Sequence, residues 1–83
     1  MIKFAEKGWD DYLYWQTADR TTLKRINQLI RDIERDPFSG IGKPEQLKHQ
    51  LSGFWSRRID DSHRLVYTVD DGIILIAQCR DHY

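Results

Sequence analysis

The chain has 83 residues with 13 basic and 13 acidic side chains, so its formal net charge at pH 7 is zero. A chain this short forms one domain, residues 1–83, which excludes a separate cofactor domain, and the balanced charge gives no bulk attraction to nucleic acid. The only cysteine, Cys79, excludes an internal disulfide, and three scattered histidines give no zinc-ligand spacing. We therefore expect no metal and no cofactor. We also expect a cytoplasmic protein, because no segment resembles a signal peptide or a bilayer span.

The N-terminal residues predict a short strand followed by a helix. Residues 2–5 are rich in apolar side chains and are expected to pair as a strand. Residues 8–17 carry side chains at the three- and four-residue spacing of one helix face. These side chains are Trp9, Tyr12, Leu13 and Gln16. We expect this helix to turn an aromatic face inward.

A second helix is predicted over residues 20–35. Its apolar stripe consists of Leu23, Ile26, Ile30 and Ile33. Asp19 or Thr21 can cap its first turn, and it should end at Asp36, because a residue before proline disfavours helical geometry. Its basic side chains include Lys24, Arg25, Arg31 and Arg35. This basic helix either exchanges weak ion pairs with the acidic first helix or faces phosphates.

After residue 36 the pattern predicts a loop and then three strands. Residues 37–44 are a loop rich in Gly and Pro. The strand segments, rich in aromatic and β-branched residues, are 54–59, 63–69 and 73–79. Short polar turns at 60–62 and 70–72 predict an antiparallel meander. The fold class is therefore α+β, with two N-terminal helices packed on one face of a small antiparallel sheet.

Turns of three residues would fix the register of this meander. Ile59 would then face His63, and Val69 would face Ile73. The core face is predicted to carry Trp55, Leu65, Tyr67, Val69, Ile73, Leu75, Ala77 and Cys79. The other face would carry Ser56, Arg58, Arg64, Val66, Thr68, Ile74, Ile76, Gln78, Arg80 and, if the strand continues, His82.

This register places Arg58 opposite Arg64, and Arg64 opposite Gln78. Like charges directly opposite each other destabilise a sheet by about 0.2–1 kcal/mol. A shared anion would relieve the repulsion. Ion pairs with Asp60, Asp61 or Asp81 would relieve it as well, and the residues alone leave both possibilities open.

A possible acid–base set lies outside the core. Glu45, Lys48 and His49 would share one side of a helical turn over 45–50. Metal-free cleavage of RNA needs a base for the 2′-hydroxyl, an acid for the leaving 5′-oxygen and fixed positive charge on the phosphate. His82 suits the acid, because imidazole titrates near neutral pH. A surface Glu–Lys pair and a frayed terminal histidine remain the alternatives.

Several segments together resemble the YoeB/Txe family of bacterial toxins in the RelE superfamily. They are WDDYLYW at 9–15, PFSGIGKPEQLKHQLSGFWSRRI at 37–59, HRLVY at 63–67 and CRDHY at 79–83. The resemblance spans essentially the whole chain. It implies a type II toxin that cuts mRNA in the ribosomal A site, leaving 2′,3′-cyclic phosphate and 5′-hydroxyl ends. It also implies as partners a YefM-type antitoxin, the 70S ribosome, a second copy or a toxin–antitoxin hetero-oligomer, and operator DNA only through the antitoxin.

The resemblance also implies roles for particular residues. Glu45 would be the general base and His82 the general acid, supported by Tyr83. Phosphate contacts would come from Lys48, Arg58 and Arg64. The resemblance leaves Phe54 and Trp55 open, and their positions come from the strand register instead: Phe54 points to the open face, where it could stack on a base, and Trp55 points inward, where a core role is expected over contact with RNA. The candidates for ribosomal RNA contacts are Lys24, Arg25, Arg31 and Arg35.

One position departs from the family, because many members have an aromatic residue where this chain has Asp81. If the tail bends, this carboxylate would raise the pKa of His82 or compete with phosphate for Arg64. Two other functions are compatible with the fold. One is a ParE-like gyrase poison, which lacks this acid–base set, and the other is a catalytically idle antitoxin-binding co-repressor.

Overall fold

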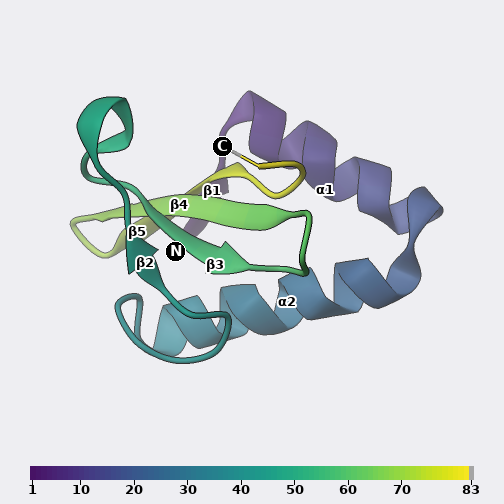
Figure 1. Ribbon diagram of the computed structural model, residues 1–83, viewed down its shortest axis with the longest axis horizontal. Coiled ribbons are helices and arrows are strands. Elements are labelled where there is room, and N and C mark those ends of the chain that lie inside the picture. Colours follow the sequence, from purple (N-terminus) through teal and green to yellow (C-terminus); the bar gives the residue numbers. More distant parts are fainter. Residues whose placement is uncertain (83) are drawn as a thin grey trace.

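The computed structural model describes residues 1–82 and consists of two helices and a five-stranded sheet (Figure 1). The helices are α1 (Glu6–Ala18) and α2 (Arg20–Arg35), with a short 3-10 turn η1 (His49–Leu51). The strands are β1 (Ile2–Phe4), β2 (Glu45–Gln46), β3 (Trp55–Arg58), β4 (Arg64–Asp70) and β5 (Ile73–Gln78), in the spatial order β1-β5-β4-β3-β2. The α+β prediction is confirmed. The sheet is mixed, however, because β1 runs parallel to β5. Within the described residues, no helix has the length and apolar character needed to span a bilayer.

The second helix follows its sequence pattern closely. The Asp19 side chain accepts hydrogen bonds from the backbone N–H groups of Thr21 and Thr22, at 3.0 and 3.2 Å, so Asp19 and not Thr21 is the cap. Ile26 and Ile33 are fully buried as predicted, and Leu29 joins them. Figure 1 shows α1 and α2 running in roughly opposite directions beside the sheet.

Gly8 allows α1 to lie very close to β5. A Cβ atom at Gly8 would lie 2.3 Å from the carbonyl oxygen of Ile76. The backbone N–H of Ala5, just before α1, donates to the same oxygen at 2.9 Å. Any larger residue at position 8 would therefore push the helix away from the strand.

The turn between β4 and β5 is one residue shorter than predicted. Asp70 pairs with Ile73, and Val69 pairs with Ile74. The two turn residues, Asp71 and Gly72, have φ angles of 52° and 75°. An Asp-Gly pair with two positive φ angles is typical of a type I′ hairpin turn, whose twist matches that of the strands. The prediction that Val69 faces Ile73 is therefore wrong.

This shift exchanges the two faces of β5 over most of its length. Ile74 and Ile76 lie in the core, whereas Ile73 and Leu75 face the opposite side, contrary to the prediction. The ladder is then irregular beside Val66, which pairs with Gln78. Gln78 is consequently not opposite Arg64. Because the irregularity inserts one residue, Cys79 returns to the core, as predicted.

The turn between β3 and β4 agrees with the prediction. Arg58 pairs with Arg64, and the backbone N–H of Ile59 donates to the carbonyl oxygen of His63 at 3.0 Å. The Asp60 carboxylate closes this turn by accepting the backbone N–H groups of Ser62 and His63, both at 2.8 Å. The side-chain positions on β3 and on the start of β4 are therefore those expected from the sequence.

Candidate active site

Glu45 lies on the sheet face that the helices do not cover. It pairs with Ser56 on β3, Ser56 pairs with Val66 on β4, and Val66 pairs with Gln78 on β5. Paired residues point to the same side, so these four side chains form a row across this face. Glu45 is exposed at one end of the row, while Ser56 and Val66 are buried in its middle.

The helical turn predicted over 45–50 is wrong. Residues 45 and 46 form β2, and the 3-10 turn begins only at His49. The backbone hydrogen bonds explain this, because the N–H of Leu47 donates to the carbonyl oxygen of Phe54 at 2.9 Å and so extends the pairing with β3. Glu45 and Lys48 nevertheless line one shallow pocket of about 340 Å³. The other residues that line it are Gln46, Leu47, His49 and Leu51.

Arg58 and Arg64 lie opposite each other on the same face as Glu45. Arg64 donates to the backbone carbonyl oxygens of Asp60, at 3.0 Å, and His63, at 3.4 Å. Within residues 1–82, neither guanidinium forms an ion pair with Asp60, Asp61 or any other carboxylate. Two adjacent cations without a carboxylate partner in this part of the chain form a surface suited to a phosphate.

The C-terminal tail passes beside this arginine pair. β5 ends at Gln78, so the strand does not continue to His82. Asp81 instead adopts a φ of 67°, and its carbonyl oxygen accepts the backbone N–H of Arg64 at 3.1 Å. His82 follows directly and is exposed. Tyr83 lies outside the described residues.

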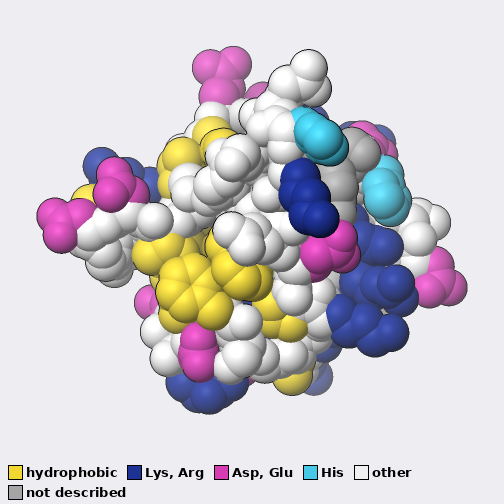
Figure 2. All heavy atoms as spheres, turned by 60° about the vertical axis from the view of Figure 1, so that its left-hand side comes forward, with side chains coloured by type: hydrophobic (Ala, Val, Ile, Leu, Met, Phe, Trp, Pro, Cys, Tyr) yellow, Lys and Arg dark blue, Asp and Glu magenta, His cyan; other side chains and the backbone are white. Residues whose placement is uncertain are grey.

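Figure 2 shows how side chains of different kinds are distributed over one side of the molecule. Lys and Arg side chains gather on one side of this view next to histidine, with acidic side chains among them, while the apolar side chains form a separate patch. Among the residues described, no three histidine, cysteine or acidic side chains come together as a metal site requires. Glu45, Arg58 and Arg64 thus place one carboxylate and two cations on the same face of the sheet.

The two aromatic residues before and at the start of β3 differ in position. Trp55 pairs with Tyr67, packs against the core and contacts the ring of Phe38, with ring centroids 5.0 Å apart. The inward position predicted for Trp55 is confirmed. Phe54 is half-buried just before the strand, where alternation predicts that it points to the Glu45 side.

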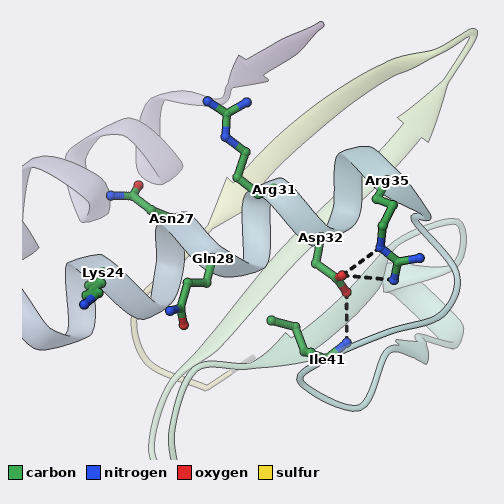
Figure 3. Close-up of a pocket in the computed structure, with 7 residues that line it drawn as sticks. All are labelled: Lys24, Asn27, Gln28, Arg31, Asp32, Arg35 and Ile41. Carbon is green, nitrogen blue, oxygen red and sulfur yellow. Dashed lines mark hydrogen bonds and ion pairs between the residues drawn. The ribbon is translucent and has the colours of Figure 1, made fainter.

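Three basic side chains of α2, those of Lys24, Arg31 and Arg35, lie along a groove of about 470 Å³ (Figure 3). The groove is lined by Lys24, Asn27, Gln28, Arg31, Asp32, Arg35 and Ile41. Arg31 forms an exposed ion pair with Glu34 at 3.3 Å, and Arg35 pairs with Asp32 at 3.0 Å. Arg25 is not among the residues of the groove and donates to the carbonyl oxygen of Arg58 at 3.3 Å.

Arg57 is a buried residue for which the sequence alone predicts no role. It is fully buried, and its guanidinium donates to the Asp32 carboxylate at 2.5 Å and to the Tyr67 hydroxyl at 3.1 Å. It also binds three carbonyl oxygens of the loop before β2, those of Asp36, Ser39 and Ile41. Strand alternation could have predicted its burial, because Arg57 lies two residues after the inward-facing Trp55 and side chains two residues apart on a strand point to the same face. Arg57 thereby fixes the loop that leads to Glu45.

The Asp32 carboxylate is strongly stabilised in its ionised form. The backbone N–H of Ile41 is the main cause and the guanidinium of Arg57 the second, and together with Arg35 they lower the pKa of Asp32 to about 2. The hydroxyl of Tyr67, which donates to the carbonyl oxygen of Pro37 at 2.6 Å, has a raised pKa because it is desolvated. The hydrogen bonds of Asp32, Arg57 and Tyr67 therefore stabilise the fold around the candidate site.

Comparisons with known proteins identify the family of this chain. Residues 4–83 match the family described as YoeB-like toxin of bacterial type II toxin-antitoxin system. The chain is 62% identical over 80 residues to Toxin YoeB of Escherichia coli strain K12, covering 96% of this chain and 95% of the relative. It is 60% identical over 82 residues to Toxin YoeB of Streptomyces coelicolor, covering 99% and 98%.

Solved structures give the same result. The YoeB/ParE toxin from Agrobacterium tumefaciens has a TM-score of 0.95 at 45% identity, covering 99% of this chain and 98% of that one. YoeB in a heterotetrameric YoeB–YefM complex from Staphylococcus aureus has a TM-score of 0.93 at 50% identity, covering 100% and 97%. The chain belongs to the YoeB-like toxins of bacterial type II toxin-antitoxin systems, and it has their RelE-like fold.

Proposed function

We propose that this toxin is a ribosome-dependent endoribonuclease that cuts mRNA in the ribosomal A site by metal-free acid–base catalysis. The observation that supports this most directly is the position of Glu45, Arg58 and Arg64 on one helix-free face, with the His82-bearing tail alongside. In this proposal the proton acceptor and the fixed positive charge come from one face of the sheet, and the proton donor comes from the tail that borders Arg64.

In the proposed mechanism Glu45 takes the proton of the 2′-hydroxyl, and the resulting oxygen attacks the adjacent phosphorus in line. Arg58, Arg64 and Lys48 stabilise the charge that develops on the phosphate oxygens. His82 gives its proton to the leaving 5′-oxygen as the P–O5′ bond breaks. The products are a 2′,3′-cyclic phosphate and a 5′-hydroxyl. An acid or a base of this kind contributes about 10²- to 10⁴-fold in rate.

Dependence on the ribosome has a physical reason in this proposal. Glu45, Lys48 and His82 are all exposed, and the pocket beside Glu45 is shallow, so the toxin alone does little to orient an RNA strand. Holding the message with the 2′-oxygen in line with the bond to be cut lowers the activation barrier by a large amount, and in this proposal the ribosome holds the message in that geometry. The basic α2 residues Lys24, Arg25, Arg31 and Arg35 would bind ribosomal RNA phosphates, with salt-sensitive affinity.

An antitoxin partner is supported by the heterotetrameric YoeB–YefM complex from Staphylococcus aureus. A YoeB dimer from the same organism, at 51% identity, supports association with a second copy. We propose a YefM-type antitoxin whose acidic tail covers Arg58 and Arg64 or displaces the tail that carries His82. An antitoxin complex that still cuts mRNA at the full rate would contradict this.

The proposal can be tested by adding the purified toxin to ribosomes that translate a defined message. Cuts mapped by primer extension should lie in the A site and carry cyclic phosphate ends. Glu45→Ala and His82→Ala should each lower the cleavage rate by about 10²- to 10⁴-fold. Glu6→Ala, which removes an exposed carboxylate at the start of α1, is the matched control and should cut like the wild type.

An intact message with the wild-type toxin would contradict the nuclease. Assays of gyrase supercoiling and of operator binding with the antitoxin would then separate a ParE-like poison from an idle co-repressor. Removal of Tyr83 should also weaken cutting, as the family resemblance implies. Unchanged cutting without Tyr83 would show that this residue has no part in the site.

A further inference from the structure

Just after the end of β5, hydrogen bonds from α1 hold the C-terminal tail, which lies near α1 in Figure 1. The buried carboxylate of Asp11 accepts the backbone N–H of Cys79 at 3.1 Å, and the indole N–H of Trp15 donates to the carbonyl oxygen of Cys79 at 2.8 Å. Arg80 then lies over the ring of Tyr14, 3.6 Å from its centroid. Both polar groups of the Cys79 backbone are therefore fixed by one helix.

A second attachment lies two residues further along the tail. The backbone N–H of Asp81 donates to Nδ1 of His63 at 2.7 Å, and the carbonyl oxygen of Asp81 accepts the backbone N–H of Arg64 at 3.1 Å. The His63 ring also packs edge-on against Trp15, with centroids 4.9 Å apart at 81°. His63 thus connects the tail, the turn before β4 and the indole that binds Cys79.

The hydrogen bond to Asp81 defines the chemical state of His63. An N–H donor requires a lone pair on its acceptor, so Nδ1 carries no proton and Nε2 carries it. Asp81 also needs such support, because a non-glycine residue in the left-handed region costs about 1–2 kcal/mol. Contacts from the surrounding structure are what maintain a strained residue of this kind.

We propose that His63 is a positioning residue for His82. By accepting the N–H of Asp81, it holds the left-handed bend at Asp81, which precedes His82 and whose carbonyl oxygen binds the backbone N–H of Arg64. This inference rests on the proposed nuclease function. His63 is not one of the proposed acid–base residues, and the role proposed for it is to hold the backbone of the tail at Asp81.

Kinetic measurements on programmed ribosomes test the role through two substitutions. His63→Ala removes the acceptor and should lower kcat by about 10- to 100-fold, because a displacement of about 1 Å at the reacting groups has an effect of this size. KM should stay within about twofold, since the basic α2 surface is unchanged. His63→Asn places an amide oxygen near the position of Nδ1 and should restore most of kcat. Ser62→Ala, in the same turn, is the control and should match the wild type.

Nuclear magnetic resonance tests the hydrogen bond independently of activity. A scalar coupling between the amide nitrogen of Asp81 and Nδ1 of His63 should be detected in the wild type. The Asp81 amide should exchange slowly in the wild type and in His63→Asn, but rapidly in His63→Ala. A wild-type spectrum without the coupling, or with a protonated Nδ1, would overturn the proposal.

The outcomes distinguish a failure of the proposed nuclease function from a failure of the positioning role of His63. A wild-type toxin that cuts no message contradicts the proposed function. Wild-type cutting with an unchanged kcat in His63→Ala contradicts the positioning role alone. Unfolding midpoints in urea, measured for each variant, show whether a loss of kcat reflects a loss of folded protein.

Discussion

Two neighbouring arginines show how strongly one position along a strand determines the role of a side chain. Arg57 and Arg58 carry the same charge, yet strand alternation turns them to opposite faces of the sheet. Arg57 is fully buried with its donors bound to Asp32, Tyr67 and loop carbonyl oxygens, whereas Arg58 is exposed beside Arg64. The first stabilises the fold, and the second can serve a ligand.

We therefore expect opposite effects from the two alanine substitutions. Arg57→Ala leaves buried acceptors and the Asp32 carboxylate without their partner, and it should lower the free energy of unfolding by about 3–5 kcal/mol. Arg58→Ala should change it by less than about 0.5 kcal/mol but weaken message cutting. Urea denaturation and the ribosome assay measure the two effects. Equal unfolding midpoints would contradict the structural role of Arg57.

At the scale of elements, the contact between α1 and β5 depends on Gly8. Helix propensity favours alanine over glycine in a helix interior by about 1 kcal/mol. The carbonyl oxygen of Ile76, however, occupies the place of a Cβ atom, at 2.3 Å. Tertiary packing and local propensity therefore oppose each other at this position.

We expect Gly8→Ala to destabilise the protein, because overpacking costs about 1–3 kcal/mol and exceeds the gain in propensity. Gln16→Ala, at an exposed position of the same helix, is the control and should change the stability by less than about 0.5 kcal/mol. Thermal and urea denaturation of both variants provide the comparison. A more stable Gly8→Ala would show that α1 lies farther from β5.

The hairpin of β4 and β5 gives a second test at this scale. A Cβ atom at Gly72 would meet nothing within 4 Å, so the cost of Gly72→Ala arises only from its φ of 75°. We expect a loss of about 1–2 kcal/mol in the free energy of unfolding. Asp71→Asn should be nearly neutral, because asparagine tolerates the left-handed region. A neutral Gly72→Ala would contradict the type I′ turn and the register that follows from it.

At the scale of the whole molecule, Asp32 connects α2, the loop before β2 and β3. Its carboxylate binds the side chain of Arg35 and the backbone N–H of Ile41 (Figure 3). It also accepts a hydrogen bond from the guanidinium of Arg57. The pKa of Asp32 is lowered from 3.8 to about 2, so the unfolded chain binds more protons than the folded one between these values. This stabilisation is present above about pH 4 and is lost as the pH falls toward 2.

We predict that the urea midpoint of the wild type decreases as the pH is lowered from 5 to 2. The pKa values of Asp19 and Asp36, which are also lowered, act in the same direction. Asp32→Asn should be less stable than the wild type at pH 7, and the difference should shrink toward pH 2. Asp10→Asn, on exposed α1 surface, is the control and should follow the wild type. A difference that stays constant with pH would contradict the role of the Asp32 charge.

The sequence by itself determined the elements whose pattern is local. The apolar stripe and the Asp19 cap determine α2, the proline at 37 ends it, and the runs of β-branched residues predict the strands. The turn after β3 could also be predicted from the sequence, because the Asp60 side chain stabilises it by accepting the backbone N–H groups of Ser62 and His63, which are close to it in sequence. The motifs were sufficient to identify the family.

Only the tertiary structure decided which residues meet across the sheet. The segment Asp70-Asp71-Gly72 is compatible with a turn of two or three residues, and a shift of one residue exchanges the faces of β5. Glu45 belongs to the row with Ser56 because β2 pairs with β3, and β1 lies beside β5 through a parallel pairing from the other end of the chain. These choices depend on burial and hydrogen bonds between residues distant in sequence, which periodicity along the chain does not encode.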